Sequence, residues 1–359
     1  MMDEPSESIQ FSDALRALSD MNTPFPVRYL RSFSDLSRRN LKELMALWPT
    51  LPEERKVSFL EDLEVVMESD TLVDYNNIAR NLLTDPNPAV RVIALRLLWE
   101  CEETNLISDL LNLTIKDEDE AVRATSASLL GKFILLGELE AISTDLKELV
   151  EDQLLEIVVS SDHARVKQRA LESLGYSSHP AAADLIQNAF QSNDPTWVTS
   201  ALCAMGRSAD ESWAPQVESM LTSPEPEVQF EAIRAAGELE LSNSREKLLS
   251  LLEDGIEDEE IRLALIWSLS QIGGEEVKEK LDELLANAID DDEIEWIEKA
   301  IENLELSTSG SLEMLDFSPD ADDELDLDDE AYLDLDEEDF LDQDDQYENG
   351  LEDDEEDEQ

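Results

Sequence analysis

The sequence predicts an all-α protein, a right-handed α-solenoid of repeated helix pairs that is followed by a disordered acidic tail. Three observations predict this fold class. One helical pattern recurs at nearly regular intervals, a second apolar helical pattern follows its copies, and the last 44 residues contain 25 acidic residues with no lysine or arginine. Helix pairs repeated at such a period stack into solenoids, whereas a strongly acidic segment cannot bury enough apolar area to fold alone.

The repeated pattern is clearest in residues 85–100, which read DPNPAVRVIALRLLWE. A turn with an acid and prolines precedes Val90, Arg91 follows it, and the small residue Ala94 stands four positions later. Leucines complete an apolar stripe, so the segment predicts an amphipathic helix with a capped start. Equivalent positions, called anchors below, are Arg55, Val90, Val122, Val166, Trp197, Val228, Ile261 and Trp296, at intervals of 35, 32, 44, 31, 31, 33 and 35 residues.

A second apolar pattern follows the anchor helix after a short polar break, as in residues 106–111 and 185–190. Neither helix can bury its apolar stripe alone. Stacking of successive pairs covers these stripes, so stability is expected to be a sum of contacts between neighbours. A small residue four positions after the anchor suits helices that pack closely. Such residues are Ala94, Ala170, Ala201 and Ala232.

Two segments carry the pattern most completely, DEDEAVRATSASLLG and SPEPEVQFEAIRAAG. Both have an acidic turn, a valine anchor, a small residue four positions later and a glycine nine positions later. This pattern resembles HEAT-like repeats of the phycobilisome-lyase type, and the resemblance covers roughly residues 50–306. The resemblance implies the solenoid fold. It implies no particular activity, because such repeats occur in scaffolds, adaptors and a few enzymes.

Four parts are expected along the chain: a flexible N-terminal segment at 1–24, a helical cap at 25–54, the repeat array at 55–306 and the disordered acidic tail at 307–359. Between residues 28 and 56, seven lysines or arginines stand against four acids, with aromatic residues interleaved. Such a composition can bind single-stranded nucleic acid. Because the net charge is −63, a solvated cap surface is the better interpretation and no nucleic-acid partner is expected.

The sequence also indicates the cellular location. The N-terminus shows neither the basic nor the apolar region of a signal peptide, and the sequence has no run of about 18 apolar residues. No membrane partner is therefore expected. Cys101 and Cys203 lie in different repeats, which should place them beyond disulfide reach, so we expect reduced thiols in the core. The sequence thus predicts a cytoplasmic protein.

A basic residue follows several anchors, and an acid stands five or six residues before it. These pairs are Arg91 with Asp85, Arg123 with Asp117, Lys167 with Asp162 and Arg262 with Glu257. Repeated pairs of this kind indicate a structural ladder that ties each turn to the next helix. Trp197, Trp267 and Trp296 are likewise interpreted as packing residues, in preference to a ligand cage.

Motifs for catalysis are sparse. The sequence contains two histidines, His163 and His179, and lacks a His-Glu-x-x-His motif, a zinc-spaced cysteine pair and a phosphate-binding glycine loop. Ser178, His179 and Asp184 are close in sequence, but such adjacency in a loop seldom gives the hydrogen-bond chain of a nucleophile. Deoxyhypusine hydroxylases, which are also built from HEAT-like repeats, carry repeated His-Glu pairs that this sequence lacks. No metal or cofactor is expected.

Candidate binding residues lie on the second helices, which we expect to line the concave side of the solenoid. Their exposed row is polar to acidic, so a basic or polar protein segment is the expected ligand. Three connections, 135–145, 175–180 and 206–215, are expected to form one rim beside it. The row consists of Ser108, Asp109, Gln187, Asn188, Glu218, Ser219, Ser250, Asp282 and Glu283.

The acidic tail is interspersed with apolar residues, a pattern typical of segments that order on a partner. A basic patch beside an apolar groove would suit it, either on another protein or on the cap residues 28–42 of the same chain. The candidate contact residues in the tail are Tyr332, Leu333, Leu335, Phe340 and Leu341.

We therefore predict a non-enzymatic protein–protein interaction scaffold or adaptor, which binds a protein partner through the solenoid groove, the loop rim and the tail. The alternative is a lyase or another enzyme of the HEAT-like repeat class, similar to the bilin lyases. A deep pocket with converging polar groups would favour the enzyme, and an open groove would favour the scaffold. The sequence leaves the partner's identity and the oligomeric state open.

Overall fold

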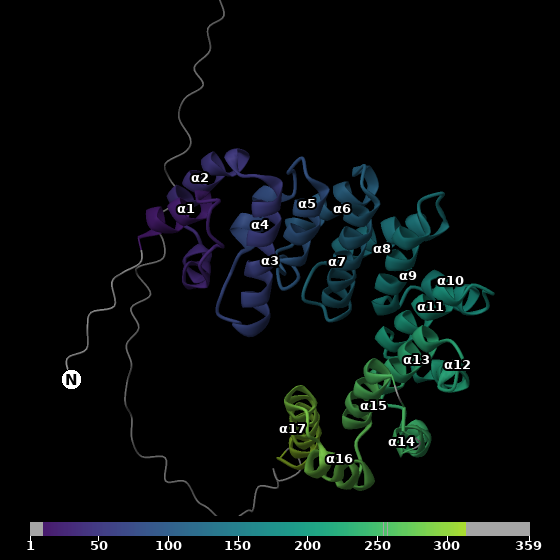
Figure 1. Ribbon diagram of the computed structural model, residues 1–359. Helices are drawn as coiled ribbons and strands as arrows, with labels where there is room; N and C mark the ends of the chain where they lie inside the picture. The colour runs from purple at the N-terminus through teal and green to yellow at the C-terminus, as the bar shows by residue number, and fades with distance from the viewer. Residues whose placement is uncertain (1–9, 254, 257, 314–359) are drawn as a thin grey trace, which may run out of the picture. The chain divides into compact units, whose positions relative to one another are not determined.

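The computed structural model describes residues 10–253, 255–256 and 258–313, and all regular secondary structure in these residues is helical (Figure 1). The prediction of an all-α solenoid is confirmed. The acidic tail from residue 314 on, including Tyr332, Leu333, Leu335, Phe340 and Leu341, lies outside the described residues. The last described helix, α17, reaches Glu313, beyond the boundary at 306 that the sequence suggested.

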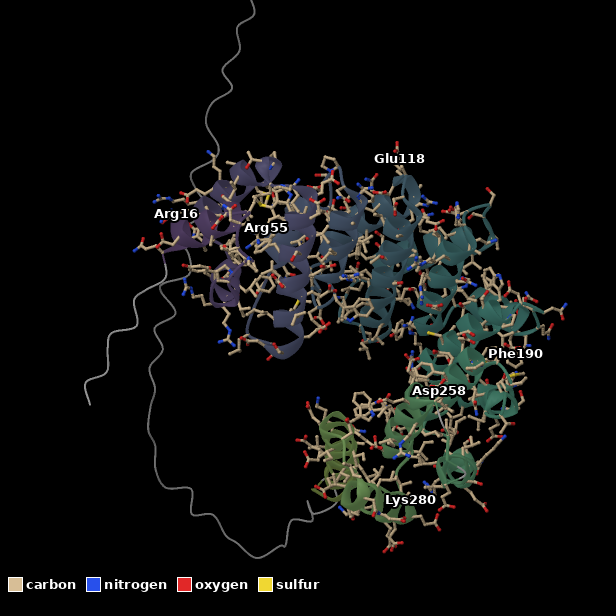
Figure 2. All side chains as sticks on the ribbon, in the orientation of Figure 1. Arg16, Arg55, Glu118, Phe190, Asp258 and Lys280 are labelled. Atoms are coloured by element: carbon tan, nitrogen blue, oxygen red, sulfur yellow. The ribbon has the colours of Figure 1, made fainter. Side chains whose placement is uncertain are left out.

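The N-terminal cap begins at Phe11, in the part that the sequence suggested to be flexible. It consists of α1 (Phe11–Ser19), η1 (Val27–Phe33), α2 (Arg38–Leu47) and η2 (Trp48–Thr50). Phe33 packs against Phe11 and Phe59, with ring centroids 5.3 and 4.8 Å apart. Arg55 (Figure 2) donates hydrogen bonds to the backbone carbonyls of Asp20 and Thr23. These contacts fix the chain that links α1 to the rest of the cap.

The anchor helices follow one another through the array, each beginning close to its anchor residue. They are α3 (Glu53–Ser69), α5 (Pro88–Arg96), α7 (Glu120–Glu138), α9 (Ala164–Ser173), α11 (Pro195–Arg207), α13 (Pro226–Glu238), α15 (Glu259–Ile272) and α17 (Asp291–Glu313). Asn87, Asp119, Asp194 and Asp258 cap four of these helices by accepting hydrogen bonds from first-turn backbone amides.

The second helices alternate with them. They are α4 (Asn76–Leu82), α6 (Leu106–Lys116), α8 (Thr144–Val159), α10 (Pro180–Phe190), α12 (Ala214–Met220), α14 (Arg245–Glu253) and α16 (Glu275–Asn287), and short 3-10 turns η3 (Leu174–Tyr176), η4 (Glu211–Trp213) and η5 (Ser242–Ser244) precede three of them. The interval after Val122 is long because its extra residues lengthen α7 and α8. The connection between these two helices is short.

Most second helices pack mainly on the anchor helix that follows them in the chain, as α6 does on α7 and α10 on α11. Neighbouring anchor helices also pack directly on one another, whereas neighbouring second helices make few contacts. The layer whose helices lie closer together forms the inner side of a stack. Locally, therefore, the anchor helices form the inner layer and the second helices the outer layer. The expectation that the second helices line the concave side is wrong.

Small residues allow the close approach of the anchor helices. Ala94, Ala170, Ala201 and Ala232 are completely buried. The glycine nine positions after the anchor has the same role, because a Cβ added at Gly237 would lie 2.7 Å from the Cα of Ser268 on the next anchor helix. At Gly175 an added Cβ would lie 2.7 Å from the Cα of Ala204.

Candidate functional site

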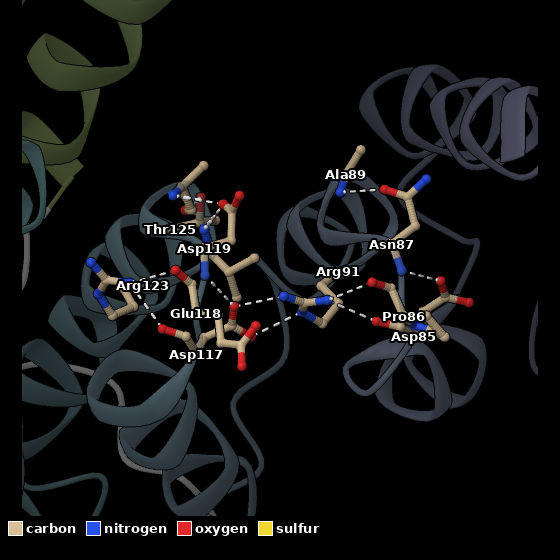
Figure 3. A network of polar contacts seen from close by, with 12 residues as sticks. Asp85, Pro86, Asn87, Ala89, Arg91, Asp117, Glu118, Asp119, Arg123 and Thr125 are labelled. Carbon is tan, nitrogen blue, oxygen red and sulfur yellow. Dashed lines mark hydrogen bonds and ion pairs between the residues drawn. The ribbon is translucent and has the colours of Figure 1, made fainter.

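The arginine after the anchor joins two consecutive turns of the array (Figure 3). Arg91 donates two hydrogen bonds to the Asp117 carboxylate, at 2.6 and 2.9 Å, and a third to the backbone carbonyl of Asp85 at 2.8 Å. Arg123 repeats this geometry with the Asp162 carboxylate, at 2.7 and 2.9 Å, and the carbonyl of Asp117. The ladder therefore exists, but the expected pairing was wrong. Each arginine binds the carboxylate of the following turn and only the backbone of its own.

At both ends of the array the basic residue after the anchor also contacts an acid, whereas in the middle Lys167 has a different partner. The Asp85 carboxylate accepts a hydrogen bond from the Trp48 indole at 2.8 Å and lies 3.5 Å from the Lys56 ammonium. At the other end Arg262 binds Glu293 at 2.5 Å. In the middle, Lys167 lies 5.8 Å from the ring centre of Trp197 instead of pairing with Asp162. Glu257, the expected partner of Arg262, lies outside the described residues.

The predicted row of polar side chains lies on α6, α10, α12, α14 and α16, in the outer layer. Ser108, Asp109, Asn188, Ser219, Ser250, Asp282 and Glu283 are exposed, while Gln187 and Glu218 are half-buried. The two half-buried residues have structural partners, since Gln187 accepts a hydrogen bond from Gln216 at 3.2 Å and Glu218 accepts one from Ser244 at 3.3 Å. The row is accessible on successive helices, although on the opposite layer from the one expected.

The connections after the anchor helices lie beside one another. Glu138, at the end of α7, accepts a hydrogen bond from the backbone amide of Ser178 at 2.8 Å. Tyr176, Ala209 and Glu240, which come from three successive connections, line one cavity of 450 Å³. The residues that follow α7, α9, α11 and α13 therefore meet at one edge of the array, as expected for the loop rim.

The inner layer presents a second row of side chains, which the sequence interpretation missed. On a helix of 3.6 residues per turn, residues six and ten positions after an anchor lie on the same side of the helix, about 120° and about 80° around its axis from the anchor. Most of these side chains are half-buried or exposed. We call this row the inner face. It consists of Arg96, Glu100, Ser128, Lys132, Tyr176, Arg207, Arg234, Glu238, Trp267 and Gln271. Glu172 and Cys203, at the equivalent positions of α9 and α11, are buried. The regular spacing of charged and aromatic residues on the anchor helices was the signal for it.

Side chains of the inner face bridge neighbouring anchor helices. Arg96 binds Glu64 of α3 with two hydrogen bonds of 2.6 Å. Lys132 donates to the backbone carbonyl of Trp99, and burial lowers the pKa of its ammonium. Arg207 donates to the Glu172 carbonyl at 3.0 Å. These contacts hold the charged groups in fixed positions, which reduces the entropy lost when a ligand binds.

Two cavities open among these residues. One, of 890 Å³, is bounded by the connection between α3 and α4 and by Arg96, Trp99, Arg165 and Arg169. The other, the tryptophan cavity, has a volume of 520 Å³ and lies among α13, α15 and α17. The rings of Trp267 and Trp296 form one side of it, with centroids 5.6 Å apart.

Arg234, which lines the second cavity, contacts the buried carboxylate of Glu231. Glu231 is 6% exposed, its Oε2 lies 3.4 Å from Arg234, and no described residue makes a hydrogen bond to its Oε1. Burial raises the pKa of this carboxyl. Burial also raises the pKa of the neighbouring Cys203 thiol to about 12. Since the thiolate is the nucleophilic form, Cys203 is unsuited to covalent chemistry. Cys101 and Cys203 are both buried and free, as predicted.

The histidines have structural positions. His179 caps α10, since its Nδ1 accepts a hydrogen bond from the Ala181 amide at 3.1 Å, and exposed His163 contacts Glu120. The ring nitrogen through which His179 caps the helix is therefore engaged with backbone. Among the described residues it makes no hydrogen bond to Ser178 or Asp184. Among the described residues no group of three or more His, Cys, Asp or Glu side chains is arranged to hold a metal ion. None of the described helices is long and apolar enough to span a membrane.

Comparison with known proteins identifies the repeats. The family model for HEAT repeats matches residues 77–153 and 214–302. The chain contains HEAT repeats in these two regions. No curated protein sequence matches it.

Solved structures with related helical arrays share little sequence with this HEAT-repeat chain. YibA of Escherichia coli is 17% identical with a TM-score of 0.40, over 80% of this chain and 99% of YibA. The CpcE–CpcF complex of phycocyanin lyase from Nostoc is 18% identical with a TM-score of 0.44, over 64% of this chain and 94% of that one. Kap121p bound to Nup53p is 14% identical with a TM-score of 0.42, over 86% of this chain and 40% of Kap121p. At this level the likeness concerns the fold alone.

Proposed function

We propose that this chain is a non-enzymatic protein-binding scaffold of the cytoplasm whose partner presents a basic patch. The observation that supports this proposal is the inner face. There, residues six and ten positions after successive anchors are mostly charged, polar and aromatic side chains. A row that repeats from helix to helix matches an extended polypeptide better than a compact small molecule. The exposed row on the second helices, the loop rim and the acidic tail are proposed as further contact surfaces.

Charge supports a basic partner. The chain carries 89 acids against 26 lysines and arginines, so a negatively charged protein would be repelled at long range. Two of the four cations of the inner face are already paired with carboxylates, since Arg96 binds Glu64 and Arg234 binds Glu238 at 2.6 Å. The carboxylates that remain available include exposed Glu100. The complex should weaken as salt rises, and its apolar contacts should keep it from vanishing.

The experiment is an affinity capture from the source cells, read by quantitative mass spectrometry, with three variants of the full chain. The first variant carries Glu100→Lys and Gln271→Lys together, which makes the charge of the inner face more positive by three. Asp109→Lys with Ser250→Lys changes the outer row by the same three charges and serves as the matched control. The third variant lacks residues 314–359.

We expect specific partners of the unmodified chain to be lost with the inner-face variant. With the outer-row variant, whose residues are proposed as secondary contacts, capture should weaken at most. Loss of the tail should weaken capture without abolishing it. If partners are lost only with the outer-row variant, the binding site lies on the second helices instead. If all variants capture the same proteins as the unmodified chain, the proposed surfaces are not used. Melting curves of each variant must first show an intact fold.

A further inference from the structure

The tryptophan cavity combines an apolar wall with carboxylates at its rim. Phe230, Leu263, Trp267 and Trp296 contribute the apolar surface, and Glu238 and Glu260 contribute the carboxylates. The indole of Trp296 is fixed by a hydrogen bond of 3.2 Å to the Leu263 carbonyl. The two indoles are therefore held at a tilt of 43° with centroids 5.6 Å apart. The wall of the cavity is formed before any ligand arrives.

The charges around the cavity favour a cation. Arg234 lines it too, but its guanidinium is engaged by Glu238 at 2.6 Å and by Glu231 at 3.4 Å. Glu260 is exposed in the first turn of α15, and the structure shows no ion pair for it among the described residues. The two rim carboxylates thus outnumber the single arginine. The faces of the indoles add attraction for a positive charge.

We propose that the tryptophan cavity binds the side chain of an arginine or lysine from a partner's basic, partly apolar segment. The methylene stem of such a side chain packs on Phe230 and Leu263, while its charged head lies near the indoles and Glu260. A purely apolar side chain would leave the carboxylates unused. An acidic segment, including the tail of this chain, would be repelled by Glu260 and Glu238. The inference rests on the proposed function and specifies the partner chemistry at one place on the inner face.

The test uses the full chain labelled with 5-fluorotryptophan. The chain contains six tryptophans, which give separate fluorine NMR signals. Trp267→Phe and Trp296→Phe identify the two signals of the cavity. The probes are a short synthetic peptide of alternating arginine and leucine and a matched peptide of alternating glutamate and leucine. We expect the arginine peptide to shift the Trp267 and Trp296 signals saturably, while the signal of buried Trp48 stays in place. The glutamate peptide should shift neither cavity signal.

Glu260→Lys should weaken binding of the arginine peptide by about threefold to tenfold, which corresponds to about 0.7 to 1.4 kcal/mol. Glu259→Lys is the matched control, because Glu259 is exposed on the same helical turn and does not line the cavity. Equal weakening by both variants would mean general attraction to an acidic protein and would overturn the proposal. Unmoved cavity signals, or equal shifts with the glutamate peptide, would overturn it too.

The two proposals fail separately. If the arginine peptide does not shift the cavity signals while the inner-face variant still loses captured partners, the tryptophan cavity is excluded and the scaffold function stands. If the peptide binds in the cavity but no partner is captured by any form of the chain, the cavity is a cation site and the scaffold proposal falls.

Discussion

Arg91 and Asp117 form a bidentate ion pair across two consecutive turns, with side chains that are only 12% and 7% exposed. Removing the guanidinium leaves a buried carboxylate without its partner. Arg91→Ala is therefore expected to lower the free energy of unfolding by about 3 kcal/mol. Urea denaturation of the full chain measures this. Arg39→Ala is the control, because Arg39 pairs with Glu43 on the surface, at exposures of 86% and 42%, and should cost less than about 0.5 kcal/mol. Equal losses would contradict the ladder's structural role.

Gly237→Ala should destabilise the protein, although alanine is the better helix former by about 1 kcal/mol. The added Cβ would meet the Ser268 Cα at 2.7 Å, and relieving such an overlap between packed helices costs about 1 to 3 kcal/mol. Thermal melting of the variant and of the unmodified chain checks this prediction. A stabilising Gly237→Ala would show that α13 and α15 are not in close contact.

Glu231→Gln should stabilise the protein at neutral pH. Burial raises the pKa of Glu231 in the folded state above its unfolded value, so the folded state favours the protonated form. The resulting penalty is full above the folded pKa and fades as the pH falls toward the unfolded pKa. Melting temperatures of the variant and the unmodified chain should therefore differ most at pH 8 and converge toward pH 5. A difference that is constant across this range would mean that the charge of Glu231 is not the cause.

Neither cysteine should react with a thiol reagent such as DTNB at pH 8 while the protein is folded. Cys203 is 6% exposed with a pKa of about 12, and Cys101 is 2% exposed. The thiolate is therefore scarce at Cys203, and the reagent cannot reach either sulfur. Both thiols should titrate fully in denaturant. Rapid labelling of Cys203 under native conditions would contradict its burial.

The pattern around Val90 was sufficient to predict the helices and their stacking, because the period and the apolar stripe are properties of local sequence. The partner of Arg91 was not predictable in this way. Asp85 stands six residues before it and Asp117 stands 26 residues after it, and only the distance between stacked turns decides between them. Sequence proximity therefore favoured the wrong acid.

The inner layer was predictable in principle. Ala232 and Gly237 show that the anchor helices pack closely, and the more closely packed helices form the inner layer of a stack. A helix of 3.6 residues per turn then places Arg234 and Trp267, six residues after their anchors, on the same side of their helices, where both are half-buried. The tryptophan cavity could not be predicted, because Trp267 and Trp296 come from different helices and the tilt between their rings depends on packing.

The most direct test of the scaffold account is site-specific photo-crosslinking of the full chain to its captured partner. A photoreactive phenylalanine analogue replaces Glu100 or Gln271 on the inner face, and Asp109 or Ser250 on the outer row as matched controls. The account predicts that the partner crosslinks from both inner positions and that crosslinking fades as salt increases. Crosslinks to the partner only from Asp109 and Ser250 would contradict binding on the inner face.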